Sequence, residues 1–474
     1  MLGHYLLTSG VLSQDQLKAV EARRTVVGGH LVESLQALNL IQPEELQSFL
    51  RQPPQVPLRL EDTGLEEQFL LNLVLKALFI TQLQTVPPLA DLLKLSQGIV
   101  DRLLQTLKKQ ALVEVPGVSD PGLLLLRHIL SERGRERALA ALAQSQYVGP
   151  APVSVSEYNR QVEKQSVSLE VIDAGKLRQA LSMLVLPDDL ITRLGEAMCA
   201  GQAILLYGPP GNGKSSVAQA LGHVFADDIY IPYAIEIDGQ IVKVFDPAIH
   251  EEAEAKAQRE GQRSTGLVQY AHDPRWVLCR RPTVISGGEL TLGMLDLEFD
   301  EISNYYEAPL QVKATGGVLV IDDFGRQRLQ PSELLNRWIV PLDKRVDYLT
   351  LHTGKKFQIA FDEIVIFSTN LPPRDLMDDA LLRRVHYKLR LDPPNLERYG
   401  LILDQVVRAN GLSIPEDVRT LILEQLYGRQ GIPVAAFHPR FIVEQVLSAS
   451  KFHKSPPVLN KQAIMRAVEN LLVE

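Results

Sequence analysis

Residues 203–216, AILLYGPPGNGKSS, combine glycines, a lysine and serines at a spacing that suits phosphate chemistry. The glycines allow successive backbone N–H groups to turn toward phosphates, the lysine reaches the β- and γ-phosphates, and the serine after it binds Mg²⁺. An apolar run precedes this segment and a helix-forming run follows it, as such a phosphate loop requires. We therefore predict ATP and Mg²⁺ binding. The predicted binding residues are Gly208, Pro209, Pro210, Gly211, Asn212, Gly213, Lys214, Ser215 and Ser216.

A pair of aspartates ends a second apolar run, in the segment VLVIDDFGR at residues 318–326. The segment resembles the metal-binding strand of P-loop NTPases, so we expect Asp322 to hold Mg²⁺ together with Ser215, usually through water. Asp323 raises the question of whether the protein hydrolyses ATP or only binds it. Most hydrolysing P-loop NTPases carry Glu at this position.

Two further motifs follow along the chain. The apolar segment FDEIVIFSTN ends at Asn370, and a polar side chain at a strand end can orient the water that attacks a γ-phosphate. The segment ALLRR then places Arg383 and Arg384 at the end of an expected helix.

In this order, the motifs resemble those of the AAA+ ATPases, over about residues 175–474. The segment LTLHTGKKFQIAFDE (349–363) is similar to a β-hairpin of the MoxR-like branch. The implied fold class is α/β: a P-loop module with a parallel sheet and a C-terminal helical lid, preceded by small, mainly helical N-terminal domains. The alternation of strand and helix after residue 158 agrees with an α/β domain.

The resemblance also implies roles for particular residues. Asn370 corresponds to sensor 1, and Asp323 stands at the position of the catalytic base. Arg383 and Arg384 correspond to the arginine that one subunit supplies to the γ-phosphate of its neighbour, and the sequence does not distinguish between them. Arg440, in FHPRFIVEQV, corresponds to the sensor 2 arginine that reaches the nucleotide from the lid. Because an arginine finger has no target in its own subunit, we expect a homo-oligomeric ring, taken to be a hexamer.

Asp323 predicts slow catalysis rather than none. Its side chain is one methylene shorter than Glu, and a misplacement of about 1 Å can cost roughly 10²-fold in rate. AAA+ members of the replication-initiator branch also carry an aspartate pair here and hydrolyse ATP. We predict a slow ATPase that remodels or regulates an unidentified protein client. Two alternatives stay open: a nucleotide-gated switch or DNA-associated regulator with little hydrolysis, and an assembly factor of a secretion or pilus machine.

Residues 1–52 contain a weak internal repeat, in which LGHYLLTSGVLSQDQL (2–17) aligns with LVESLQALNLIQPEEL (31–46). The repeat resembles the N-terminal domain of type II secretion and type IV pilus assembly ATPases, which binds a cyclic dinucleotide in some members. The second copy has Val32 and Asn39 where the motif has glycines, and a backbone can approach a ligand closely only without a Cβ. We therefore expect helical packing and no cyclic-dinucleotide binding.

The segment LADLLKLSQGIVDRLLQTLKKQALVEV (89–115) resembles a winged helix-turn-helix. Ser96 is expected to cap a helix that buries Ile99, Leu103, Leu104 and Leu107. DNA binding needs basic side chains on such a helix, and here basic and acidic residues are mixed. We therefore favour protein contact or packing, with nucleic-acid binding as the alternative.

The whole composition is that of an ordinary globular protein with several domains. The 474 residues are 45% hydrophobic and 22% charged, with a net charge of −8 and two cysteines, too few for a disulfide scaffold. No apolar run approaches the roughly 18–20 residues of a membrane span, and no signal peptide is visible, so we expect a cytoplasmic protein. The region 229–310 has no interpretation from general motifs. The predicted domains are a helical repeat (1–52), a winged-helix-like module (58–145), a linker (146–174), the P-loop subdomain (175–393) and the lid (394–474).

Overall fold

The computed structural model describes most of the chain. The described residues are 6–7, 12–27, 34–35, 37–41, 52–116, 126–170, 172–253, 271–376, 382–429 and 433–471. The first residues of the predicted N-terminal repeat, residues 42–46 of its second copy and the Ala380–Leu381 part of the arginine motif lie outside them.

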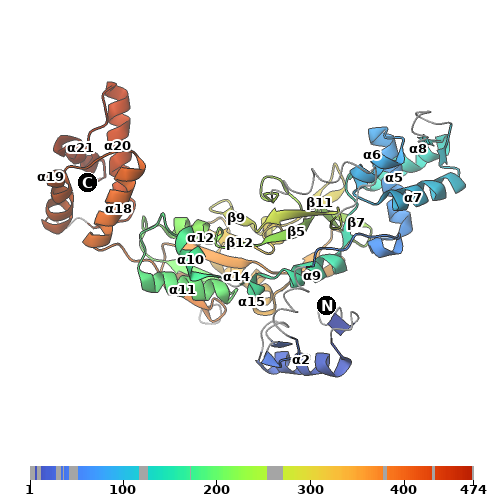
Figure 1. Cartoon of the computed structure of the whole chain (residues 1–474), viewed down its shortest axis with the longest axis horizontal. Coiled ribbons are helices and arrows are strands. Elements are labelled where there is room, and N and C mark those ends of the chain that lie inside the picture. The colour runs from blue at the N-terminus through green and yellow to red at the C-terminus, as the bar shows by residue number, and fades with distance from the viewer. Residues whose placement is uncertain are drawn as a thin grey trace.

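A five-stranded parallel sheet forms the centre of the molecule (Figure 1). Its strands, in spatial order, are β16 (Tyr387–Arg390), β4 (Ile204–Tyr207), β15 (Ile364–Thr369), β12 (Val318–Ile321) and β9 (Thr283–Ser286). All neighbouring pairs run parallel. The three central strands, β4, β15 and β12, are short, and their apolar residues are almost entirely buried, as expected where a sheet is covered on both faces. The predicted α/β class is confirmed.

Helices cover the two faces of this sheet in separate layers. One face packs against α10 (Ala174–Ala180), α11 (Asp188–Cys199) and α12 (Lys214–Leu221), and the other against α14 (Pro331–Arg337) and α15 (Ile339–Lys344). Successive residues of β4 alternate between the layers: Leu206 packs with the first group and Leu205 with the second. This alternation follows from the two-residue period of a strand.

A second, mixed sheet lies beside the first and takes four of its strands from the region without a motif. Its order is β10 (Glu298–Asp300), β11 (Tyr305–Glu307), β7 (Gln240–Lys243), β6 (Ala234–Ile237) and β3 (Val153–Ser154). Its core includes residues of helix α9 (Val155–Lys164) and of two antiparallel pairs. These pairs are β5 (Asp228–Pro232) with β8 (Trp276–Arg280), and β13 (Val346–Thr350) with β14 (Lys356–Ala360). The β13–β14 pair is the predicted hairpin, and it begins three residues earlier than expected.

Residues 61–144 form a helical module with a small β-ribbon. Its elements are η1 (Glu61–Thr63), α5 (Glu67–Thr81), α6 (Val86–Leu93), α7 (Gln97–Lys109), β1 (Val113–Glu114), β2 (Ile129–Leu130) and α8 (Glu132–Gln144). The Ser96 hydroxyl accepts a hydrogen bond from the backbone N–H of Ile99, so the predicted cap of α7 is confirmed. The four predicted apolar residues of α7 are buried in the core of this module. No single described helix is long and apolar enough to cross a membrane, although α5 and α6 reach that length and composition as a pair bent by 111°.

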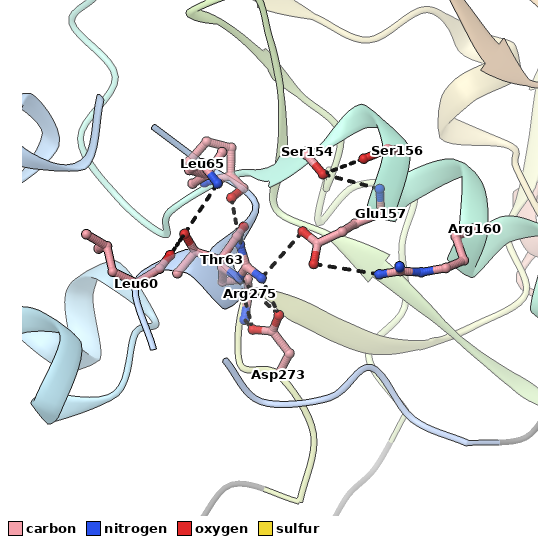
Figure 2. A network of polar contacts seen from close by, with 10 residues as sticks. Leu60, Thr63, Leu65, Ser154, Ser156, Glu157, Arg160, Asp273 and Arg275 are labelled. Atoms are coloured by element: carbon pink, nitrogen blue, oxygen red, sulfur yellow. Dashed lines mark hydrogen bonds and ion pairs between the residues drawn. The ribbon is translucent and has the colours of Figure 1, made fainter. Parts of the chain in front are cut away.

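A buried ionic network joins this module to the rest of the chain (Figure 2). Arg275, 1% exposed, contacts the Asp273 carboxylate at 2.7 Å and lies 3.6 Å from Glu157 of α9. Its guanidinium also donates to the backbone oxygens of Thr63, in η1, and Pro152, just before β3. One side chain therefore ties together the helical module, the segment after it and the second sheet.

Helices make up both ends of the described chain (Figure 1). The C-terminal lobe consists of α18 (Leu396–Ala409), α19 (Glu416–Thr420), a π-helical turn (Leu421–Arg429), α20 (His438–His453) and α21 (Lys461–Leu471), around a core of its own. At the other end, α2 (Gln14–Val27) contributes to a small cluster in which the repeat residues Leu6, Leu12, Leu35 and Ile41 are buried. The remaining short elements are η2 (Val167–Leu169), η3 (Leu292–Leu295), α13 (Leu310–Lys313) and α16 (Pro373–Leu376).

Candidate nucleotide site

The glycine-rich loop connects the C-terminal end of β4 to the first residue of α12. Gly213, the last residue before the helix, has φ of 81°, and no atom lies within 4 Å of the point where a Cβ would be. Glycine adopts this backbone conformation without strain and leaves open space at the start of the helix. The N–H groups at a helix start are suited to anion binding. The loop therefore has the geometry of a phosphate cradle.

Lys214 is the first residue of α12, and its ammonium turns back over the loop. Its Nζ donates to the backbone oxygens of Gly208 at 2.9 Å and Pro209 at 2.8 Å. Burial lowers the pKa of Lys214, while the neighbouring carboxylates of Asp322 and Asp323 oppose this by raising it. The lysine thus lies between the phosphate loop and the aspartate pair.

Ser215 and Asp322 meet across the sheet edge. The Ser215 hydroxyl donates to Asp322 Oδ1 at 2.9 Å, although 107 residues separate the two. A hydroxyl and a carboxylate side by side next to a phosphate cradle fit Mg²⁺, which takes oxygen ligands and keeps several waters. The two residues predicted to hold the metal are therefore adjacent.

Asp323 and Asn370 form a second polar pair at the same edge. Strand β15, which leads to Asn370, lies between β4 and β12, so its end faces both the loop and the aspartates. Asn370 Nδ2 lies 3.4 Å from Asp323 Oδ1. Strand order explains why three motifs far apart in the sequence converge, since parallel strands end at one edge of a sheet.

The backbone fixes Asp323 in an uncommon conformation. Its φ is 49°, in the left-handed region, which Asp adopts more readily than most residues. The next residue, Phe324, is held on both sides: its N–H donates to the Ser368 oxygen at 2.7 Å, and its oxygen accepts from the Thr369 hydroxyl at 2.6 Å. These contacts with β15 set the direction of the Asp323 carboxylate. Left-handed non-glycine residues cluster at functional sites.

The arginine pair is divided between two environments. Arg384 donates to the Asp343 carboxylate of α15 at 2.9 Å and is partly buried. Arg383 is exposed, and within the described residues nothing forms an ion pair or hydrogen bond with it. The pairing of Arg384 was not visible in the sequence, because Asp343 lies 41 residues away on a different element.

The C-terminal lobe touches the phosphate loop directly, at residues that the sequence did not single out. The N–H of Phe437 donates to the Gly211 oxygen at 3.0 Å, and the N–H of Ala436 donates to Asn212 Oδ1 at 3.3 Å. A Cβ on Gly211 would come within 2.4 Å of the Phe437 ring. Gly211 is therefore required for the close packing of this ring, in addition to any contact with phosphate.

Arg440, the predicted sensor 2 arginine, is exposed on α20 rather than in contact with the phosphate loop. Its guanidinium is 78% exposed and donates to Glu444 at 2.7 Å, one turn farther along α20. The side chain does not contact the phosphate loop in this arrangement, whereas Phe437, three residues earlier, does. Phe437 belongs to the same FHPR segment as Arg440, but the sequence contains no pattern that marks the phenylalanine as a contact of the phosphate loop.

A cavity of about 270 Å³ continues from the phosphate loop toward the C-terminal lobe. Asn212 lines it on the side of the loop and Ala436 on the side of the lobe. The other lining residues are Val185, Leu186, Pro187, Asp189, Leu190, Arg193, Arg390, Leu391, Asp392, Pro393, Pro394, Arg398 and Ile402. The volume is close to the lower end of the range for small-molecule pockets, about 300 Å³.

Comparisons with known proteins add a family match for the lobe only. Residues 395–470 match a model described as a domain of unknown function, DUF8689. No curated protein sequence matches the chain significantly.

Solved structures resemble the chain weakly. NtrX from Brucella abortus in complex with ADP is 14% identical with a TM-score of 0.37, over 72% of this chain and 66% of that chain, just under two thirds. The Holliday junction branch migration motor RuvB from Thermotoga maritima is 15% identical with a TM-score of 0.35, over 63% of this chain and 74% of that one. Because identities and scores are low, the function is inferred from the chain's own residues.

Proposed function

We propose that this protein is an AAA+ ATPase that binds ATP with Mg²⁺ and hydrolyses it slowly. The observation that carries the proposal is the convergence of two polar pairs beside the phosphate loop. Ser215 lies 2.9 Å from Asp322, and Asp323 lies 3.4 Å from Asn370, at one edge of a parallel sheet. A structural role alone does not explain this grouping, because none of the four is needed to cover the core.

Each residue of the site has a separate role in this proposal. The loop N–H groups and Lys214 would bind the phosphates, and Ser215 and Asp322 would hold Mg²⁺. The metal, when bound, neutralises charge that develops on the phosphate oxygens. Asp323 would accept the proton of the attacking water, and Asn370 would orient that water. The 3.4 Å contact between them supports the assignment, since both could contact the same water.

The cavity beside Asn212 supports a nucleoside-binding role for the surface between the loop and the lobe. Its size and its position next to the phosphate loop fit the ribose and base of a nucleotide. Residues of α11, of the segment after β16 and of α18 line it, so a bound base would contact the sheet domain and the lobe together. A bound nucleotide would in this way connect the sheet domain with the C-terminal lobe.

We further propose a homo-oligomeric ring, taken to be a hexamer of the MoxR-like type, in which Arg383 acts on the nucleotide of the neighbouring subunit. Arg383 is exposed, whereas Arg384 is engaged by Asp343 of its own subunit. ATP turnover in the ring would remodel or regulate a protein client through the N-terminal modules, the first resembling the secretion-ATPase domain and the second a winged helix. These assignments, the domain boundaries and a cytoplasmic location rest on the sequence motifs.

A second candidate is a nucleotide-gated switch with little hydrolysis. The observation that favours it is the short Asp323 side chain on a left-handed backbone, because a carboxylate set back from the γ-phosphate would activate water poorly. Binding would then be intact and turnover absent.

The experiment that separates the two compares nucleotide binding with phosphate release in the full-length protein. We expect wild type to bind ATP and hydrolyse it slowly, Lys214→Ala to lose both, and Asp323→Asn to keep binding and lose turnover. Lys176→Ala, an exposed lysine on α10, is the matched control and should behave as wild type. Binding without turnover in wild type would favour the switch, and a fast basal rate in the isolated subunit would contradict the predicted slow catalysis.

A further inference from the structure

A second cavity, of about 280 Å³, lies where the helical module of residues 61–144 meets the second sheet. Helices α5 and α8 line one side, and residues 239–241, at the start of β7, line the other. Figure 1 shows α5 and α8 next to β7, at the far end of the molecule from α12. None of its lining residues belongs to the nucleotide site. Junctions between domains are frequent places for small-molecule sites.

The most unusual side chain in this cavity is Lys76 of α5, which is only 4% exposed. Its ammonium donates to the backbone oxygen of Ser145, the residue that ends α8, at 3.0 Å. Among the described residues no carboxylate pairs with it, and burial lowers its pKa to about 8. An ammonium has three donors, and a buried cation without an anionic partner is costly to keep. The lysine therefore offers unused donors to the cavity.

The remaining lining suits an organic molecule rather than a bare ion. Phe69 and Phe299 contribute aromatic surface, while Asn72 and Gln240 contribute amide groups. His352, the other lining residue that titrates, stacks on Phe299 with ring centroids 4.4 Å apart and hydrogen bonds to the Tyr306 hydroxyl. The two acidic residues next to the turn between β6 and β7, Glu236 and Asp238, already accept hydrogen bonds or ion pairs from other residues.

Both acidic residues near this turn have partners within the chain. Asp238 forms an ion pair with Lys355, and the Glu236 carboxylate accepts from the Gly239 N–H at 2.6 Å. Neither acts on the Lys76 ammonium, whose pKa responds to burial alone. Among the described residues, no carboxylate therefore completes the lysine, and its remaining donors are available to a bound anion.

We propose that this cavity binds a small organic monocarboxylate, with the carboxylate on the Lys76 ammonium and an apolar body against Phe69 and Phe299. The single positive charge lies at the C-terminal end of α8, where the backbone oxygens add negative potential. Such a site accommodates one negative charge better than the two of a phosphate. No arginine lines the cavity, so the bidentate grip typical of phosphate sites is missing as well.

The test uses benzoate and its neutral analogue benzamide, titrated into the full-length protein by calorimetry. We expect saturable binding of benzoate, at least tenfold weaker binding of benzamide, and at least a tenfold loss of benzoate affinity in Lys76→Met. Lys108→Met, an exposed lysine of α7 in the same module, is the matched control and should bind benzoate as wild type does.

A second variant keeps the test informative if Lys76→Met fails to fold. Asn72 lies one helical turn before Lys76 on α5, so Asn72→Asp supplies a carboxylate within the chain. We expect this variant to melt at a higher temperature than wild type and to lose benzoate binding. Equal affinity for benzoate and benzamide, unchanged benzoate binding in both cavity variants, no saturable benzoate binding, or tighter Lys76-dependent binding of inorganic phosphate would each overturn the proposal.

Discussion

Glu363 gives a prediction whose magnitude follows from its surroundings. The residue precedes β15, its side chain is fully buried, and neither carboxylate oxygen has a hydrogen-bond partner among the described residues. Arg345 is near, but the hydrogen bond that joins the two residues runs to the backbone oxygen of Glu363, at 2.8 Å. Burial raises the pKa of Glu363 well above its usual value, more than Arg345 lowers it. We therefore expect this carboxyl to keep its proton to a higher pH in the folded protein than in the unfolded chain.

This protonation makes stability depend on pH in a defined direction. Above the ordinary pKa of a glutamate, the unfolded chain releases the proton and the folded chain keeps it. The free energy of unfolding then falls by about 1.4 kcal/mol for each pH unit, until the pH reaches the raised pKa of the folded state. Glutamine has nearly the same shape and does not titrate. Glu363→Gln should therefore gain stability relative to wild type as the pH rises from about 5.5 to 7.5, by at most about 1.4 kcal/mol for each pH unit.

Urea unfolding followed by tryptophan fluorescence measures this difference locally. Trp338 packs in the core that contains β15, whereas Trp276, on β8, packs in the core beneath the second sheet, so a Trp276→Phe background isolates the relevant signal. Glu196→Gln, an exposed residue on α11, is the matched control, and its free energy of unfolding should differ from that of wild type by the same amount at every pH.

Two results would refute the reasoning. A gap between wild type and Glu363→Gln that stays constant across this pH range would mean that Glu363 does not titrate on unfolding. Destabilisation by Glu363→Gln at pH 7.5 would mean that the carboxylate is ionised and interacts favourably with Arg345.

Four further predictions concern the site and its supports. Arg383→Ala should lower ATP turnover by about 10³-fold or more, while Arg384→Ala should cost at most about 1 kcal/mol of stability; equal turnover in both would exclude the assignment of the finger. Ser215→Ala should weaken Mg²⁺-dependent but not Mg²⁺-free nucleotide binding, measured with a fluorescent analogue. Phe437→Ala should loosen the lobe and increase hydrogen exchange in the phosphate loop, and unchanged exchange would show that the ring contact is dispensable. Arg275→Met should destabilise the protein by about 3–5 kcal/mol in thermal melts, because it leaves a buried carboxylate uncompensated, and a neutral result would contradict that.

The strands and caps near the motifs could be predicted because local sequence determines them. The apolar runs before Gly208 and Asp322 became β4 and β12, and Ser96 caps α7 as its spacing indicated. The same reasoning found the β13–β14 hairpin. Periodicity and capping act over a few residues, so a single sequence carries them.

Contacts across the fold could not be predicted, since pairing partners leave no local pattern. The pairing of Arg384 with Asp343 and the network around Arg275 depend on how separate elements pack. The strand order of the second sheet was also not predicted, because its short strands are interrupted by turns and contain no recognisable motif. The burial of Lys76 could not be predicted either, because it depends on how α5 packs against the rest of the fold.

The contact between the lobe and the phosphate loop indicates how a nucleotide could move the molecule. Gly211 contributes both its carbonyl oxygen and the space left by its missing Cβ to Phe437. A shift of the loop around phosphates would therefore have to carry Phe437 with it or break the contact. Because α20 begins at the next residue, His438, such a shift would act on the lobe before any other part. The helical module at the other end is held by the buried charges of Arg275, so it would follow the second sheet rather than the loop.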